Sequence, residues 1–292
     1  MTGNIKIIIV GILTLAIGVA VLVGCSRERT VKSMNSNGHT KKISIVGSTT
    51  VAVPMELLIE KYKDINKDVT IELQGIGSSA GIKAVSDEIA NIGMSSRNLK
   101  EEEKTKELTE TIIAYDGIAL VVHPSNKVSN LTKDQIKDIF EGNITNWKEV
   151  GGENKEIIVI TREYGSGTRD AFEELMKLQE EKDDKKMSTI APSALVAEGT
   201  GTILATVSSK TGSIGFVSLG FVSDTVKILS IDGIKPTTQT VVDGSFPISR
   251  PLLLITKKDG DNASKEFINF ILTEEGQKIM SSQYIPVKNE LR

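Results

Sequence analysis

The chain has 292 residues, of which 39% are hydrophobic and 25% are charged, and its formal net charge is −3. A chain of this length buries a large core, so we expect one or two globular domains. No run of lysine and arginine is interleaved with aromatic residues. The sequence therefore lacks the basic footprint of nucleic-acid-binding proteins, and we expect no nucleic-acid partner.

The N-terminus carries a membrane-targeting signal. Residues 7–24 form an apolar run behind Lys6, and the run is long enough to span a bilayer as a permanent anchor. It ends in Leu-Val-Gly-Cys at residues 22–25, which resembles the processing box of bacterial lipoproteins. That resemblance implies that residues 1–24 are a lipoprotein signal peptide and that Cys25 carries the lipid.

Cys25 is the only cysteine of the chain, so no intrachain disulfide and no cysteine-based metal site is expected. Residues 25–40 are polar, and we expect them to form a flexible, lipid-anchored stalk. The predicted location is therefore the extracytoplasmic face of the cell membrane, in a bacterium of the Gram-positive type; the alternative is an outer-envelope location in another bacterium.

From residue 41 onward, strand-like runs alternate with amphipathic stretches. Strands are expected at residues 42–47, 68–73 and 90–94, and helices at residues 54–66, 79–89 and 99–108. This alternation favours an α/β fold with a largely parallel sheet, in which ligands bind beyond the carboxyl ends of the strands.

A long apolar segment then changes the pattern, and its length suits a strand that crosses between two lobes. That strand is expected at residues 112–122, followed by strands at 157–160, 213–217 and 252–256 and by helices at 133–140, 170–178, 201–208, 263–271 and 273–280. Residues 181–188 and 197–201 are interpreted as solvent-exposed loops.

Residues 161–175 read TREYGSGTRDAFEEL, in which a Gly-Ser-Gly-Thr tetrad stands where a helix is expected to begin. A helix start leaves backbone N–H groups unpaired and carries a partial positive charge, and Ser166 and Thr168 add hydroxyl donors. Arg162 and Arg169 flank the tetrad, and a guanidinium matches two oxygens of a phosphate group. The stretch is a candidate anion site; the alternative is an ordinary serine-capped helix with surface arginines.

Glycine and hydroxyl residues are combined in the same way at three more strand-to-helix junctions, residues 47–50, 75–81 and 93–97. Each places hydroxyls and free backbone donors at the carboxyl end of a strand. One such junction is routine capping. Four of them in two α/β halves favour a cleft for a small oxyanion.

An enzymatic interpretation rests on residues 77–81, Gly-Ser-Ser-Ala-Gly, which match the nucleophile elbow of serine hydrolases, with Ser78 as the nucleophile. A general base is hard to place, because the chain has two histidines, of which His39 lies in the expected stalk and His123 precedes Pro124. Two histidines and a lipidated cysteine do not favour a zinc site, so no metal and no cofactor is expected.

Four segments together carry a family resemblance: LQGIGSSAGIKAV, IGMSSRNL, TREYGSGTRDAFEEL and FPISRPLLLI. In this order they resemble the phosphate-binding subunit of the bacterial phosphate ABC transporter, from about residue 42 to the C-terminus. The resemblance implies the type II periplasmic-binding-protein fold, two α/β lobes with a ligand cleft between them. Lobe 1 would comprise residues 41–116 and 246–292, and lobe 2 residues 117–245.

The resemblance also implies a set of phosphate-binding positions, which fall on Thr50, the backbone N–H of Val51, Ser78, Arg162, Ser166, Gly167 and Thr168. One position departs from the family pattern, because Ser96 stands where the best-known members have an aspartate that accepts the proton of phosphate. We expect Ser96 to lie at the ligand and Asp116, at the lobe crossing, to supply the missing acceptor; the alternative for Asp116 is a solvated turn. Arg169 is expected to brace the site.

The implied function is capture of inorganic phosphate and its delivery to the permease subunits of an ABC transporter, without catalysis and by a monomer. Three alternatives remain at this point. The ligand could be another tetrahedral oxyanion such as sulfate or molybdate, which the replacement at Ser96 favours. The protein could be a secreted serine hydrolase that uses Ser78, or a phosphate sensor or adhesin that has lost transport.

Overall fold

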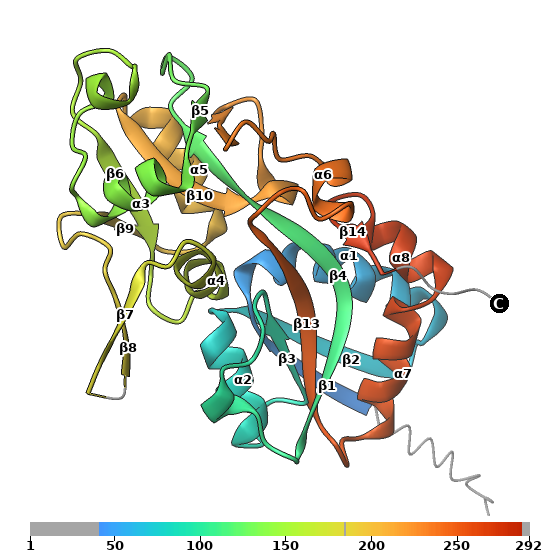
Figure 1. The fold of residues 1–292 in the computed structure, drawn as a ribbon. Coiled ribbons are helices and arrows are strands. Elements are labelled where there is room, and N and C mark those ends of the chain that lie inside the picture. Colours follow the sequence, from blue (N-terminus) through green and yellow to red (C-terminus); the bar gives the residue numbers. More distant parts are fainter. Residues whose placement is uncertain (1–40, 184, 288–292) are drawn as a thin grey trace, which may run out of the picture. The chain divides into compact units, whose positions relative to one another are not determined.

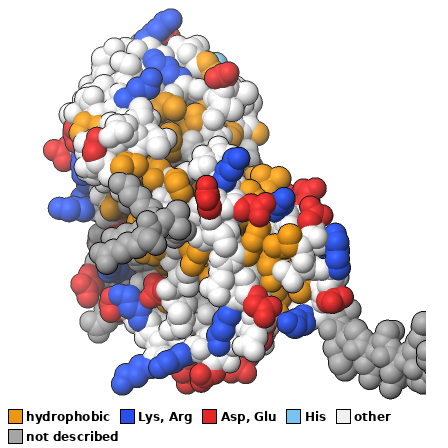
Figure 2. Space-filling model, turned by 90° about the vertical axis from the view of Figure 1, so that its right-hand side faces the viewer, with side chains coloured by type: hydrophobic (Ala, Val, Ile, Leu, Met, Phe, Trp, Pro, Cys, Tyr) orange, Lys and Arg blue, Asp and Glu red, His pale blue; other side chains and the backbone are white. Residues whose placement is uncertain are grey.

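The computed structural model describes residues 41–183 and 185–287 (Figure 1). The expected signal peptide, Cys25 and the stalk at residues 25–40 lie outside the described residues. Within the described part of the chain, no helix is both long and apolar enough to cross a membrane. Acidic and basic side chains are interspersed over the face drawn in Figure 2, in keeping with the small net charge.

Helices and strands alternate along the chain. The first part contains β1 (Lys41–Gly47), α1 (Thr49–Ile65), β2 (Val69–Gly75), α2 (Ser78–Ser86), β3 (Ile92–Ser95), the 3-10 turn η1 (Glu101–Glu103) and the long β4 (Leu108–Val122). The middle part contains β5 (Asn130–Leu131), α3 (Lys133–Glu141), η2 (Trp147–Val150), β6 (Ile158–Arg162), α4 (Gly167–Leu175), β7 (Gln179–Lys182), β8 (Lys185–Ser188), β9 (Leu195–Ala197), α5 (Thr200–Ser209) and β10 (Ser213–Ser218). The last part contains η3 (Leu219–Phe221), β11 (Lys227–Ile228), β12 (Ser230–Ile231), α6 (Thr238–Val242), β13 (Ser249–Lys257), α7 (Asn262–Ile271), α8 (Glu274–Met280) and β14 (Ile285–Pro286).

The main sheet runs in the order β2-β1-β3-β13-β4-β10-β6-β9, and β11 and β14 also pair with β4. Its two ends are parallel: β1 pairs with β2 and β3, and β6 pairs with β9 and β10. The centre is antiparallel, because β13 pairs with β3 and β4, and β10 with β4, in opposite directions. The expectation of a largely parallel sheet was therefore wrong at the centre, where β13 returns alongside β4 in the opposite direction.

Two hydrophobic clusters fill opposite ends of this sheet. The first core cluster draws its residues from segments 43–114 and 252–284 and lies under α1, α7 and α8. The second core cluster draws its residues from segment 118–248 and includes Trp147 and the aromatic group Phe140, Phe172 and Phe216. The chain passes from one cluster to the other within β4 and again around the start of β13.

The start of α1 is held by a contact from the far end of the chain. We expected this helix from residue 54, but it begins at Thr49, so Pro54 lies inside it. In an α-helix the N–H of residue 54 would donate to the carbonyl of Thr50, and proline has no N–H. The hydroxyl of Tyr284 donates to that carbonyl instead, at 2.9 Å. The C-terminal part therefore supports the first turn of α1.

Two other segments differ from expectation. The predicted helix at residues 99–108 is only the 3-10 turn η1, because Leu99 and Leu108 are its only large apolar residues and give a helix no face to bury. Residues 181–188, interpreted as a loop, contribute to the antiparallel hairpin β7–β8, whose strands pair from Gln179 to Ser188. Exposed charged strands of this kind carry little apolar periodicity.

Candidate functional site

The junction between β1 and α1 forms the first wall of the site. The side chain of Ser48 caps α1, its Oγ accepting the N–H groups of Thr50 at 3.2 Å and Val51 at 3.4 Å. Gly47 has φ of 144°, and a Cβ there would collide with the backbone of Met94, so only glycine lets β1 and β3 end side by side. Thr50 and Val51, both predicted from sequence, thus lie in the buried first turn of α1.

The start of α2 and the end of β3 contact the β1–α1 junction through serine hydroxyls. Ser78 Oγ accepts the N–H of Ser96 at 3.1 Å and lies 3.4 Å from Ser96 Oγ. Ser48 Oγ donates to Ser96 Oγ at 3.0 Å. All three side chains are buried. The structure therefore brings three of the four sequence motifs into one hydroxyl cluster.

The helix α4, which follows the Gly-Ser-Gly-Thr tetrad, begins against the same cluster. Ser166 caps α4, and Thr168 Oγ1 lies 3.2 Å from Thr50 Oγ1. Gly167 is so close to α2 that a Cβ on it would overlap Ser78 Oγ. The predicted residues Ser166, Gly167 and Thr168 therefore face those of α1 and α2 across the boundary between the two core clusters.

Thr200, at the start of α5, was missed in the sequence. Its Oγ1 lies 3.1 Å from Thr49 Oγ1 and 3.4 Å from Thr50 Oγ1, and it accepts from Arg162 Nη1 at 3.4 Å. The segment Glu-Gly-Thr-Gly repeats the glycine and hydroxyl pattern after the short strand β9, with Gly199 as the cap at φ of 77°. That signal was present, but the segment was interpreted as a solvent loop.

Arg162 ends β6 and is the buried cation of the cluster, with its side chain 2% exposed. Its Nε and Nη2 donate to Glu163 at 2.8 and 2.7 Å, and Nη2 also donates to Thr49 Oγ1 at 3.2 Å. Burial opposes ionisation of Glu163, but the hydrogen bonds and charge of Arg162 prevail and hold the pKa of the Glu163 carboxyl below its ordinary value. Arg162 is therefore a charge-paired arginine whose other contacts are long ones to threonine hydroxyls.

This arrangement suits a small oxyanion. The starts of α1, α2, α4 and α5 converge, and a helix start carries a partial positive charge that favours an anion. At α1 the N–H groups of Thr50 and Val51 donate to Ser48 Oγ, so an anion there would compete with this cap. Hydroxyls adapt as donors or acceptors, while the guanidinium supplies the charge-assisted bonds. Among the described residues, no group of three or more His, Cys, Asp and Glu side chains is placed to hold a metal ion.

Asp116 lies in β4 beside this cluster, with both carboxylate oxygens engaged. Arg250 donates to Oδ2 through Nη2 at 2.8 Å and Nε at 3.1 Å, and Ser218 Oγ donates to Oδ1 at 2.9 Å. Burial raises the pKa of the Asp116 carboxyl, against the lowering effect of Arg250. Arg250 Nη1 in turn donates to the carbonyl of Ser96 at 3.0 Å. Asp116 is thus linked to the site through Arg250, and its role as a ligand acceptor stays a prediction.

Arg169 points away from the hydroxyl cluster and braces the strand that carries Arg162. Its Nη1 donates to the carbonyl of Arg162 at 2.8 Å, and its Nε donates to Glu173 at 2.7 Å. Its Nη2 donates to Ser188 Oγ at 3.3 Å, and the guanidinium lies 4.0 Å from the ring centre of the exposed Tyr164. These contacts tie β6, α4 and the β7–β8 hairpin together.

Among the residues that the structure describes, none is placed as a catalytic base for Ser78. Its Oγ is engaged by Ser96, as described above, and the imidazole Nδ1 of His123 lies 2.8 Å from Ser125 Oγ. His123 is the only histidine within the described residues, because His39 lies outside them. A nucleophilic serine needs a histidine or another base within hydrogen-bond reach, so the hydrolase interpretation has no geometric support.

The chain is similar to known binding proteins over most of its length. A family model described as a PBP superfamily domain matches residues 33–275. The phosphate-binding protein PstS of Borreliella burgdorferi is 31% identical over 250 residues, which cover 84% of this chain and 89% of that protein. PstS of Bacillus subtilis is 31% identical over 287 residues, which cover 94% of this chain and 92% of that protein.

Two solved structures are similar over most of the chain. One is a putative phosphate ABC transporter substrate-binding protein from Clostridium perfringens with bound phosphate, 44% identical, with a TM-score of 0.80 and coverage of 85% of this chain and 100% of the other. The second is an ABC-type phosphate transport receptor from Vibrio cholerae, 39% identical, with a TM-score of 0.73 and coverage of 83% and 99%.

Proposed function

Because the chain belongs to the PBP superfamily and, within it, to the PstS family of phosphate-binding proteins, we propose that it captures inorganic phosphate for import by an ABC transporter. The observation that carries this proposal is the meeting of four helix starts and one buried arginine at a single hydroxyl cluster. Such a site binds and releases an oxyanion and contains no activated nucleophile. It is therefore a receptor site and not an enzyme site.

The two lobes of this receptor are residues 41–116 with 246–292, and residues 117–245. The distribution of the core supports the division except at residue 246, because the first core cluster uses segments 43–114 and 252–284 and the second uses segment 118–248. Phe246 and Ile248 pack in the second cluster. β4 and β13 connect the lobes. Phosphate binds between them, and closure presents the loaded protein to the permease.

The phosphate ligands are drawn from both lobes. Lobe 1 contributes the first turns of α1 and α2 and the end of β3: Thr50, Val51, Ser78 and Ser96. Lobe 2 contributes the end of β6 and the first turn of α4: Arg162, Ser166, Gly167 and Thr168. We add Thr200 to this set, because its hydroxyl contacts both Arg162 and the start of α1. Since ligands come from both sides, phosphate stabilises the closed arrangement.

The partners follow from the N-terminal sequence and the family. Lipid on Cys25 tethers the receptor to the extracytoplasmic face of a Gram-positive type cell membrane, and residues 25–40 give it reach. The receptor acts as a monomer and docks on the permease subunits of the transporter. No other cofactor or metal takes part.

Ser96 favours a second candidate ligand, another tetrahedral oxyanion such as sulfate or molybdate. A carboxylate at that position would repel an anion without a proton, because two acceptors would face each other, but a serine hydroxyl donates as readily as it accepts. If Asp116 supplies the acceptor, Asp116→Asn should lose the preference for phosphate over sulfate. If Asp116→Asn still preferred phosphate over sulfate, Asp116 would not be the acceptor.

The decisive experiment is calorimetric titration of the anion-stripped protein with phosphate and then sulfate, at neutral and mildly alkaline pH. One-to-one phosphate binding that sulfate does not compete away is the expected result. Equal binding of both anions would mean that Ser96 has broadened the site. Binding of neither anion would contradict the proposal.

A further inference from the structure

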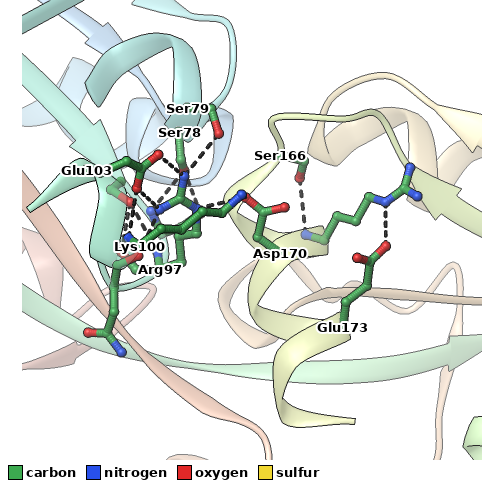
Figure 3. A network of polar contacts seen from close by, with 12 residues as sticks. Ser78, Ser79, Arg97, Lys100, Glu103, Ser166, Asp170 and Glu173 are labelled. Atoms are coloured by element: carbon green, nitrogen blue, oxygen red, sulfur yellow. Dashed lines mark hydrogen bonds and ion pairs between the residues drawn. The ribbon is translucent and has the colours of Figure 1, made fainter. Parts of the chain in front are cut away.

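Arg97 follows β3 and is saturated with partners, as Figure 3 shows. Its side chain is 3% exposed, and all five N–H groups donate. Nη1 donates to the carbonyl of Asn98 at 2.8 Å and to Glu103 at 2.6 Å, and Nη2 donates to Ser79 Oγ at 3.0 Å and to Glu103 at 2.7 Å. Nε donates to Asp170 at 2.8 Å. Four bonds stay among residues 79–103, and one reaches α4.

Asp170 receives a second cation from the same side. Lys100 Nζ lies 3.3 Å from Asp170 Oδ2, the oxygen that also accepts from Arg97. A backbone hydrogen bond also connects the same two segments: the N–H of Ser79 donates to the carbonyl of Gly165 at 3.2 Å. Both cations come from the segment after β3, and the carboxylate comes from the first turn of α4. The ion pair therefore bridges the two proposed lobes beside the anion site without using a residue assigned to the ligand.

We propose that Arg97 and Lys100 hold Asp170 as a latch that sets how long the closed cleft retains phosphate. The proposal rests on the proposed function, since only two lobes that separate would break and remake this contact. Arg97 and Lys100 act through closure and do not touch the ligand. They are positioning residues, because phosphate itself binds at the hydroxyl cluster.

The latch is suited to opening and closing. When the lobes part, Arg97 keeps its four bonds within lobe 1, and Glu103 continues to balance its charge. Asp170 is left at a helix start, where a carboxylate is favoured and water solvates it. No buried charge is stranded, so opening avoids the penalty that breaking a buried pair normally carries. Because Glu103 fixes the guanidinium, the latch re-forms in the same geometry.

The exposure and position of Asp170 decide whether its removal weakens or strengthens phosphate binding. Water screens fully exposed pairs, but the side chains of Arg97 and Asp170 are 3% and 15% exposed, so their attraction is screened less. An unpaired carboxylate in the first turn of α4 would repel phosphate, but here two cations neutralise it. Removing Asp170 should therefore cost more through the lost latch than it gains through reduced repulsion.

The test compares the full chain in detergent micelles with three variants, by calorimetric titration with inorganic phosphate and by the rate of phosphate release. Asp170→Asn should weaken binding about tenfold, mainly through faster release, and Lys100→Gln about threefold. Wild-type affinity should fall with added salt more steeply than that of Asp170→Asn. Asp134→Asn is the matched control, since Asp134 lies in the first turn of α3, and it should bind like wild type.

Unchanged or tighter phosphate binding by Asp170→Asn, with wild-type binding intact, would overturn the latch. Should wild type bind no phosphate, the proposed function fails, and the latch is judged by a second readout. Spin labels on Lys83→Cys in α2 and Glu174→Cys in α4, in a Cys25→Ser background, report the distance between the lobes. Asp170→Asn should shift this distance distribution to longer values, and identical distributions would reject the proposal.

Discussion

The two arginines Arg97 and Arg162 are both buried beside the starts of α1, α2 and α4, yet their partners differ. Arg97 uses all five N–H groups, three of them in bonds of 2.6–2.8 Å to carboxylates. Arg162 makes two such bonds, to Glu163, and its remaining contacts are 3.2 and 3.4 Å long and end on threonine hydroxyls, of which Thr200 is one. A hydroxyl gives way to an anion easily, whereas a carboxylate does not.

On the proposed function, we expect this difference to separate a guanidinium that recognises the ligand, Arg162, from one that maintains the architecture, Arg97. Charge-assisted bonds are about twice as strong as neutral ones, so we expect an incoming phosphate to displace the hydroxyl contacts of Arg162 with a net gain. Arg97 has no donor left to offer. Burial and charge alone would have ranked the two residues equally, and only the list of partners distinguishes them.

Replacing Arg162 tests the ligand side of this comparison and should have the largest effect. Arg162→Ala removes the guanidinium donors that contact the hydroxyls of Thr49 and Thr200. Two charge-assisted bonds to phosphate at about 1.5–3 kcal/mol each predict a loss of at least ~100-fold in phosphate affinity. Calorimetric titration measures this loss. Arg162→Lys is the control, because it keeps the charge without the fork and should bind with intermediate affinity. If Arg162→Ala bound phosphate with wild-type affinity, residues other than Arg162 would recognise the ligand.

Gly167→Ala should block closure and produce the next largest loss. A Cβ at Gly167 would overlap Ser78 Oγ and lie 2.7 Å from Ser96 Oγ, and both atoms belong to the opposite lobe. If the two proposed lobes separate, the overlap is relieved in the open arrangement. We therefore expect the fold to survive while phosphate affinity falls by roughly 30- to 100-fold, or about 2–3 kcal/mol. Titration and circular dichroism measure the two effects.

The matched control for that variant is Gly201→Ala in α5, where a Cβ would meet nothing within 4 Å. It should bind phosphate like wild type and should be slightly more stable, because alanine favours a helix more than glycine does. If Gly167→Ala bound as tightly as this control, the starts of α4 and α2 would not approach each other in the loaded protein.

Sequence reasoning found the helix starts because their chemistry is local. The segments 47–50, 75–81 and 166–168 each contain the glycine and hydroxyl residues that a strand-to-helix junction needs, so the sequence indicates them without knowledge of their neighbours. Segment 93–97 has the same composition, but no α-helix follows it. Thr200 was missed for a physical reason: its preceding strand β9 is only three residues long, so no strand pattern marks the junction. An isolated Gly-Thr-Gly is indistinguishable from a flexible loop.

The architecture between these junctions depends on distant contacts that no local pattern encodes. The antiparallel pairing of β13 with β4 joins segments more than 100 residues apart, and the alternation of helices and strands does not specify it. Arg97 was seen only as the residue after Ser96, because its partners Glu103 and Asp170 are separated from it by a misassigned helix and by 73 residues. Charge pairs between residues distant in the sequence could therefore be identified only from the structure.

Thr200→Val tests a neutral partner of Arg162 and should lower phosphate affinity less than the changes at Arg162 and Gly167. Valine keeps the shape of the side chain but removes the hydroxyl that contacts Arg162 and the start of α1. We expect phosphate affinity to fall by about 5- to 10-fold, equivalent to one neutral hydrogen bond of ~1 kcal/mol. Thr202→Val is the matched control, since Thr202 is exposed in the same helix. Equal affinities for the two variants would remove Thr200 from the site.

Glu103→Gln tests the architectural side and should affect phosphate affinity least, by no more than about threefold, while lowering stability by ~2 kcal/mol at neutral pH. Burial opposes ionisation of Glu103, but hydrogen bonds from Arg97 and from the Lys100 backbone hold the pKa of its carboxyl below the ordinary value of 4.5. A depressed carboxyl pKa stabilises the fold fully above the ordinary value, and this stabilisation is lost as the pH falls through the folded-state pKa. The melting temperature of wild type should therefore fall between about pH 5 and pH 3 more steeply than that of the glutamine variant. Parallel melting curves across that range would show that the bonds between Arg97 and Glu103 add no stability, and the division between a recognising and an architectural arginine would then lose its second half.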